Sequence, residues 1–182
     1  IGDSRIDICR INGSSYAYEI KTEYDTFDRL GSQMQDYLRT FQKVYVIVPI
    51  GRVNDVKNLI PESCGIISYR ITKNREVVFS YQKCAQKNCC DIKFCLDSLS
   101  SGDMSYFLKL LNEKDFKTRA DKRTRLLQIA ATRSIWTPYR KLLRHKYADQ
   151  WRFITEHFDQ ILPVDIQSFF SSKMDPNLLY AK

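Results

Sequence analysis

Two acidic residues and a lysine in this sequence could form a metal-assisted hydrolytic site, because we expect them on two neighbouring strands. Asp7 falls in the segment 5–11, and Glu19 and Lys21 fall in the segment 15–21. Because side chains alternate along a strand, Glu19 and Lys21 share one face of it. Carboxylates on two paired strands can hold Mg²⁺ or Mn²⁺, and a lysine beside them can orient a metal-bound water. The set is suited to metal-assisted hydrolysis of a phosphodiester bond.

Other catalytic classes lack their motifs. The chain contains no P-loop, no G-x-G-x-x-G and no H-E-x-x-H, and neither His145 nor His157 has a nucleophile motif close to it in sequence. Four of the six cysteines lie within residues 84–95, but their C-x4-C-C-x4-C spacing lacks the C-x-x-C pair that is typical of zinc sites. We therefore expect reduced thiols in this segment.

The context of the Glu19–Lys21 tripeptide singles it out, because an acidic residue two positions before a lysine occurs four times in the chain. The pairs Asp55–Lys57 and Asp115–Lys117 are expected on helices. The pair Asp91–Lys93 follows the cysteines with no acidic strand before it. Glu19–Lys21 alone has an acidic strand and a turn before it and an amphipathic helix, about 26–41, after it.

The expected elements divide the chain into an α/β part and a helical part. Alternating or continuous apolar patterns predict strands at 5–11, 15–21, 43–49, 65–71 and 76–81, with helices near 26–41 and 53–59. The polar segment 98–103 is expected to be a linker. Helical periods follow at 106–111, 119–131, 135–147 and 150–161.

The register of the first hairpin tests whether Asp7 and Glu19 can share one site. If Asn12-Gly13 formed a two-residue loop, Asp7 would stand opposite Tyr18 and would point away from Glu19. A three-residue loop that also includes Ser14 places Asp7 opposite Glu19. A shared site therefore requires the odd loop or a bulge.

Positive charge is concentrated in the C-terminal half. The chain carries 29 Lys+Arg and 21 Asp+Glu, and residues 104–152 contain 13 of the basic and 4 of the acidic residues. Solvated helix faces would explain this excess, and so would a surface that binds phosphates. The basic helices lack an apolar aromatic face and no apolar run is long enough to span a bilayer, so we expect a cytoplasmic protein with no membrane partner. The residues expected to contact nucleic acid are Lys114, Lys117, Arg119, Lys122, Arg123 and Arg125.

Asp7, Glu19-Ile20-Lys21 and the helix with Gln33-x-x-x-Tyr37 resemble the PD-(D/E)XK, or restriction-endonuclease-like, nuclease superfamily. The stretch from about residue 3 to 48 is most similar to its bacterial RecB-like branch. The resemblance implies a mixed central sheet flanked by helices and a metal-dependent nuclease or endonuclease that acts on DNA rather than RNA. It also implies Asp7, Glu19 and the Ile20 carbonyl as ligands of Mg²⁺ or Mn²⁺. Lys21 would be the catalytic lysine, and Gln33 and Tyr37 would line the site.

Two features depart from the superfamily pattern. A helix and a first strand that normally precede the acidic strand are not identifiable before Ile1, so we expect them upstream of this sequence. The proline of the superfamily name is also absent before Asp7. With these departures, we expect a nuclease core at 1–100 and a basic helical region at 101–182.

Two further hypotheses remain open at this stage. One is a non-catalytic nucleic-acid-binding module that uses the basic C-terminal helices, and the other is a protein-interaction domain whose basic helices meet an acidic partner. A homodimer or a larger complex is compatible with each of these hypotheses.

Overall fold

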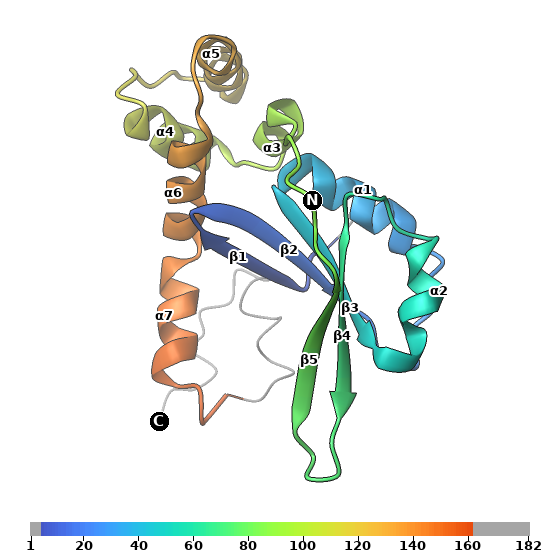
Figure 1. Cartoon of the computed structure of the whole chain (residues 1–182). Helices are drawn as coiled ribbons and strands as arrows, with labels where there is room; N and C mark the ends of the chain where they lie inside the picture. The colour runs from blue at the N-terminus through green and yellow to red at the C-terminus, as the bar shows by residue number, and fades with distance from the viewer. Residues whose placement is uncertain (1–4, 162–182) are drawn as a thin grey trace.

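The computed structural model describes residues 5–161, which form a mixed five-stranded sheet followed by a helical region (Figure 1). The strands are β1 (Ile8–Asn12), β2 (Ser14–Ile20), β3 (Lys43–Pro49), β4 (Gly65–Ile71) and β5 (Val77–Lys83). The helices are α1 (Leu30–Thr40), α2 (Val53–Lys57), α3 (Ile92–Asp97), α4 (Ser101–Leu110), α5 (Arg119–Thr132), α6 (Trp136–Lys146) and α7 (Ala148–Glu156), with a 3₁₀ turn at Ile50–Arg52. The expected α/β class with a C-terminal helical region is confirmed.

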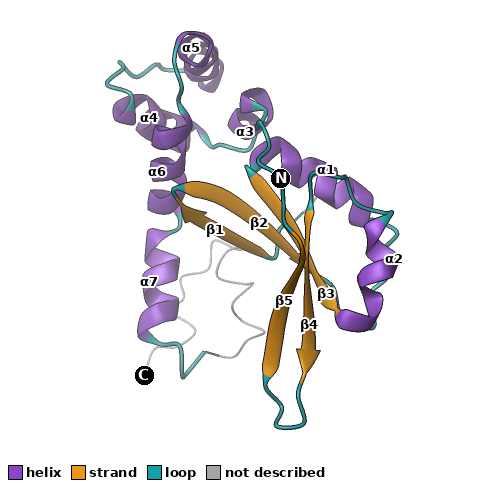
Figure 2. Cartoon of the chain, in the orientation of Figure 1, coloured by secondary structure: helices purple, strands orange, loops and turns teal. Residues whose placement is uncertain are grey.

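The sheet follows chain order, β1-β2-β3-β4-β5. The outer pairs β1/β2 and β4/β5 are antiparallel, while β2, β3 and β4 run parallel. Helix α1 makes the crossover from β2 to β3, and α2 makes the crossover from β3 to β4, as parallel pairing requires. Both helices lie on the same face of the sheet (Figure 2).

The core under α1 explains why β3 has a continuous apolar sequence. Val44, Val46 and Val48 are fully buried against the helix, whose Leu30 and Met34 are also fully buried. The intervening residues of β3 face the other side of the sheet, where Tyr45 is also buried. A strand that is covered on both faces needs apolar residues at nearly every position.

The β1/β2 hairpin has the odd register that a shared site requires. Its pairs run from Ile8↔Tyr18 to Asn12↔Ser14, with Gly13 at the apex in the left-handed region (φ 66°). The two residue numbers of every pair add up to 26, so the next position in this register sets Asp7 opposite Glu19. The strand expected at 5–11 begins later than predicted, and Asp7 lies immediately before β1.

Helix α1 begins at Leu30, later than the start near residue 26 that the sequence suggested. The carboxylate of Asp25 does not cap the helix, because it accepts hydrogen bonds from the backbone N–H and the hydroxyl of Thr22 at 2.7 and 2.6 Å. The Arg52 side chain also donates to the carbonyl oxygens of Glu23 and Asp25. These contacts hold residues 22–25 as a turn and delay the helix.

The helical region has its own core, built from α3 to α6. The segment 98–103, expected to be a linker, instead contains the start of α4. Ser100 and Asp103 form a capping box, and Lys146 of α6 donates to the Asp103 carboxylate at 2.7 Å. Burial opposes ionisation of Asp103, but the hydrogen bonds from Lys146 and Ser100 outweigh it and lower the pKa of this carboxyl.

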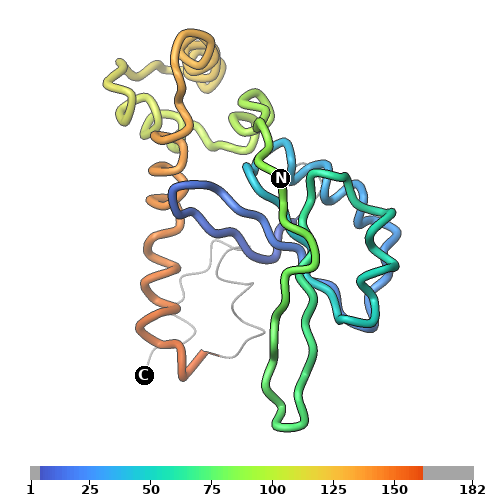
Figure 3. The backbone as a smooth tube through the Cα atoms, in the orientation of Figure 1, coloured from blue at the N-terminus to red at the C-terminus, as the bar shows by residue number. Residues whose placement is uncertain are grey.

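The helical region lies beside the first hairpin, where α6 contacts β1. The backbone trace shows α6 and α7 on this side, while the β4–β5 hairpin projects away from the helices (Figure 3). Within residues 5–161, no helix is both long and apolar enough to cross a membrane.

Candidate active site

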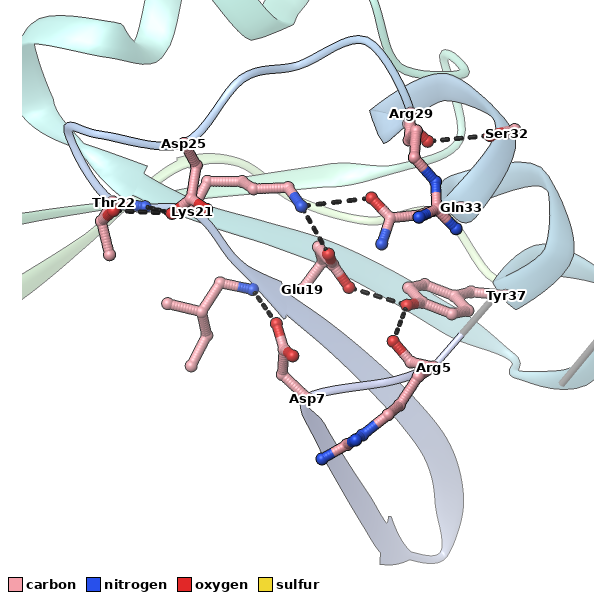
Figure 4. A network of polar contacts seen from close by, with 11 residues as sticks. Arg5, Asp7, Glu19, Lys21, Thr22, Asp25, Arg29, Ser32, Gln33 and Tyr37 are labelled. Carbon is pink, nitrogen blue, oxygen red and sulfur yellow. Dashed lines mark hydrogen bonds and ion pairs between the residues drawn. The ribbon is translucent and has the colours of Figure 1, made fainter. Parts of the chain in front are cut away.

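Glu19 is the centre of a polar network at the C-terminal end of β2 (Figure 4). Its side chain points towards α1 and is almost entirely buried, with 2% of the residue exposed. Lys21 Nζ lies 2.8 Å from Oε1, and the Tyr37 hydroxyl donates to Oε2 at 2.7 Å. The buried charge is thus paired and hydrogen-bonded, as burial of a carboxylate requires.

Helix α1 supplies the other wall of the network. Gln33 and Tyr37 are one turn apart and therefore project from the same face of the helix. The ammonium of Lys21 donates to Gln33 Oε1 at 3.2 Å as well as to Glu19. An ammonium has three N–H groups, so one remains for a water or a phosphate oxygen.

Asp7 joins the network through the backbone of β2. Its Oδ2 accepts a hydrogen bond from the Ile20 N–H at 2.8 Å. The residue lies on the exposed side of the site, whereas Glu19 is buried behind it. Desolvation by the surrounding protein raises the pKa of Asp7 and the Glu19 carboxylate adds to this, against the lowering effect of the Ile20 N–H and of Lys21.

The hydroxyl of Tyr37 lies between two acceptors, the Glu19 carboxylate and the carbonyl oxygen of Arg5 at 2.6 Å. Burial, followed by the hydrogen bond to Glu19, raises the pKa of Tyr37 far above its usual value, so the group stays a donor. The Arg5 carbonyl is the one member of the network that the sequence did not predict. A main-chain acceptor leaves no signal in the residue types.

The donors that this site offers towards a divalent cation are carboxylate oxygens, of which those of Glu19 already accept from Lys21 and Tyr37. The described residues contain no group of three His, Cys, Asp or Glu side chains that could hold a metal ion. The resemblance to the PD-(D/E)XK superfamily implies the Ile20 carbonyl as a third ligand beside the Asp7 and Glu19 carboxylates. Mg²⁺ prefers oxygen ligands and keeps several waters, so few protein ligands suffice.

The comparisons with known proteins place the chain in a phage family. The family model described as Bacteriophage P4 protein cII matches residues 2–169. The chain belongs to this family.

A curated relative in the cII family is Protein cII of Enterobacteria phage P4. It is 28% identical to the chain over 75 residues, and the aligned part covers 41% of this chain and 28% of that protein. The match therefore spans well under a third of the relative's length. No solved structure matches the chain.

The basic residues expected to contact nucleic acid are mostly engaged within the helical region of this cII family member. Lys122 is buried, with Nζ 2.5 Å from the Ser105 hydroxyl and 3.3 Å from Asp115. Three arginines bind neighbouring groups: Arg119 the Leu99 and Asp97 carbonyl oxygens, Arg123 the Asp97 carboxylate and Arg125 the Glu113 carboxylate. Lys114 and Lys117 are exposed in the loop before α5. Helix α5, which carries or follows these six residues, lies apart from β2 and α1 (Figure 1).

The other acidic–x–lysine tripeptides have different local roles. Asp55 and Lys57 lie on α2, as expected, and Asp91 caps α3 through the N–H groups of Lys93 and Phe94. The expectation of a helix at Asp115 was wrong, because Asp115 lies in the loop before α5. Only Glu19–Lys21, among these pairs, lies next to a second carboxylate, that of Asp7, and next to Gln33 and Tyr37 of α1.

Proposed function

We propose that the chain is a metal-dependent nuclease that hydrolyses phosphodiester bonds, with DNA as the expected substrate. The observation that carries the proposal is the convergence of Asp7, Glu19, Lys21, Gln33 and Tyr37, which lie immediately before β1, at the end of β2 and on α1. These residues resemble the PD-(D/E)XK pattern. The mixed sheet and the helix between two parallel strands are compatible with a restriction-endonuclease-like core.

Each residue has a defined role in this proposal. Asp7 and Glu19, with the Ile20 carbonyl, would hold the divalent ion, which supplies charge stabilisation at the reacting phosphate. The Lys21 ammonium would orient the attacking water through its remaining N–H. Gln33 fixes the Lys21 side chain, and Tyr37 holds the Glu19 carboxylate in place through its hydroxyl.

The test compares two lysines that each follow an acidic residue by two positions. Lys21→Ala should abolish cleavage of plasmid or single-stranded DNA in Mg²⁺ or Mn²⁺, because it removes the group that orients the water. Lys57→Ala, on the exposed face of α2, should leave cleavage unchanged. EDTA should stop cleavage by both the native chain and this control, and the same assay with RNA identifies the substrate.

Two results would contradict the proposal. One is the absence of metal-dependent cleavage by the folded native chain on all three substrates. The other is equal activity of the native chain and Lys21→Ala, with circular dichroism showing both folded. Retained, salt-sensitive DNA binding without any cleavage would instead support a non-catalytic nucleic-acid-binding module.

A further inference from the structure

The face of the sheet opposite α1 carries a row of tyrosines that the proposed nuclease site does not use. The register places Tyr18 of β2 beside Tyr45 of β3, and Tyr45 beside Gly65 of β4. The Tyr16 and Tyr18 ring centroids are 6.4 Å apart with planes 7° from parallel, and those of Tyr18 and Tyr45 are 5.7 Å apart at 16°. Three rings on two strands thus share nearly one orientation.

Gly65 allows the Tyr45 ring to lie across the neighbouring strand. A Cβ at Gly65 would come within 2.3 Å of the Tyr45 ring, so this ring occupies the space that a side chain would fill. Tyr81 of β5 makes an edge contact with Tyr45 at 5.8 Å and is 66% exposed. The row of aromatic side chains therefore extends from β2 to the edge strand β5, with Tyr45 buried between Tyr18 and Tyr81.

Two cations flank this surface at one end. The register aligns Arg10 of β1, Tyr16 of β2 and Lys43 of β3 in one row. The Arg10 guanidinium lies over the Tyr16 ring, 4.2 Å from its centroid, and Lys43 Nζ lies 5.8 Å from the same centroid. The row that contains Tyr18 and the row that contains Tyr81 include no acidic residue.

Tyr69 of β4 lies on the same face as Tyr45, four positions along β4 from Gly65. Burial raises the pKa of Tyr69, and the charges of Glu23 and Asp25 raise it further. A polyanion that contacts the face should place its phosphates at Arg10 and Lys43 rather than near Tyr69.

We infer that this face binds single-stranded nucleic acid, with unpaired bases stacked on Tyr18 and Tyr81 and phosphates held by Arg10 and Lys43. Aromatic rings beside cations are what a single strand needs, because every base has a face to stack and every nucleotide has a charge to pair. A duplex keeps its bases stacked on one another and has no base face to offer. The inference does not depend on catalysis, since Glu19 faces the other side of the sheet.

The test measures fluorescence anisotropy of a labelled oligothymidylate, an oligouridylate and a DNA duplex in EDTA, with the full chain. EDTA prevents metal-dependent cleavage, so a failure to bind is recorded separately from a failure to cut. Tyr18→Leu and Tyr81→Leu each keep an apolar side chain and remove the ring. Each substitution should weaken single-strand binding about five- to 100-fold. Tyr24→Leu is the matched control, because Tyr24 is 94% exposed and lies outside the sheet.

Arg10→Ala should weaken binding and lower the slope of log K against log salt by about 0.7, the value for one phosphate contact on a single strand. Arg70→Ala removes an exposed cation from β4 that lies on the other face of the sheet and should leave that slope unchanged. The inference fails if no single strand binds at low salt, if the duplex binds as tightly, or if both leucine variants bind like Tyr24→Leu. Self-association in sedimentation that is lost in Tyr81→Leu, without oligonucleotide binding, would also overturn it in favour of a protein partner.

Discussion

The pair Glu19–Lys21 predicts an asymmetric effect on stability that a double-mutant cycle can measure. Side-chain exposure is 3% for Glu19 and 13% for Lys21, so neither charge is well solvated. Replacing Lys21 by Met would leave the Glu19 carboxylate buried with the Tyr37 hydroxyl as its remaining donor. Replacing Glu19 by Gln would leave the lysine with Gln33 and with a long stem that can carry the ammonium towards solvent.

The two single substitutions should therefore cost different amounts of unfolding free energy. Removing one partner of a buried pair costs about 3–5 kcal/mol, and we expect about 3 kcal/mol for Lys21→Met because Tyr37 still binds the carboxylate. Glu19→Gln should cost about 1–2 kcal/mol, as for a lost hydrogen bond to a charged group. The double variant leaves no buried charge, so it should be more stable than Lys21→Met. Its loss of unfolding free energy should be well below the sum of the two single losses.

Urea unfolding followed by circular dichroism gives the four free energies, provided that the m-value stays constant across the set. Lys57→Met is the control for replacing an exposed lysine and should change stability by less than about 0.5 kcal/mol. The reasoning is refuted if the two effects add within about 0.5 kcal/mol, because that would mean the charges do not interact. It is equally refuted if Glu19→Gln is the more destabilising change.

Further substitutions test the backbone and the helical core through the same unfolding measurement. Gly13→Ala should cost about 1 kcal/mol, because its φ of 66° strains an L-residue although nothing lies within 4 Å of the added Cβ. Gly65→Ala should cost more, about 1–3 kcal/mol, because its Cβ would overlap the Tyr45 ring. Lys122→Ala should cost about 2–3 kcal/mol through lost packing and lost hydrogen bonds in the helical core. Since the pKa of Asp103 is lowered on folding, its contribution is complete above its unfolded pKa of about 4 and is lost at lower pH; Asp103→Asn should weaken that acid dependence.

The strand assignments show what an apolar pattern can determine. Segments 43–49 and 65–71 were predicted with the bounds that the structure gives to β3 and β4, because an apolar strand between turn residues has few alternatives. The predicted start of α1 and the predicted linker at 98–103 were wrong for one reason. Both depend on which polar side chain binds which backbone group, and Thr22–Asp25 and Ser100–Asp103 offer the same residue types for a turn and for a cap.

The candidate site was predictable where it follows from register and less so where it follows from tertiary contacts. The glycine of Asn12-Gly13-Ser14 allows the odd loop, and the odd loop alone sets Asp7 on the side of Glu19. The spacing of Gln33 and Tyr37 places both on one face of α1, but no pattern states that this face meets Lys21. The charge count carries no such information either, since it cannot distinguish a solvated arginine from one that binds the neighbouring helix, as Arg123 does.

The two faces of β2 separate the two proposals physically. Odd-numbered residues of this strand point to α1, and the last of them, Glu19, forms a buried network with Lys21 and Tyr37 that holds charge in a fixed geometry. Even-numbered residues, Tyr16 and Tyr18, point to the opposite side and present rings beside a guanidinium. The pairing of β2 with β3 fixes these two faces of β2, whereas the hairpin loop at Gly13 sets the register of β1 against them. A one-residue insertion in this loop should therefore turn Asp7 away from Glu19 and Arg10 away from Tyr16, which removes one member from each surface while Glu19 and Tyr18 stay in place.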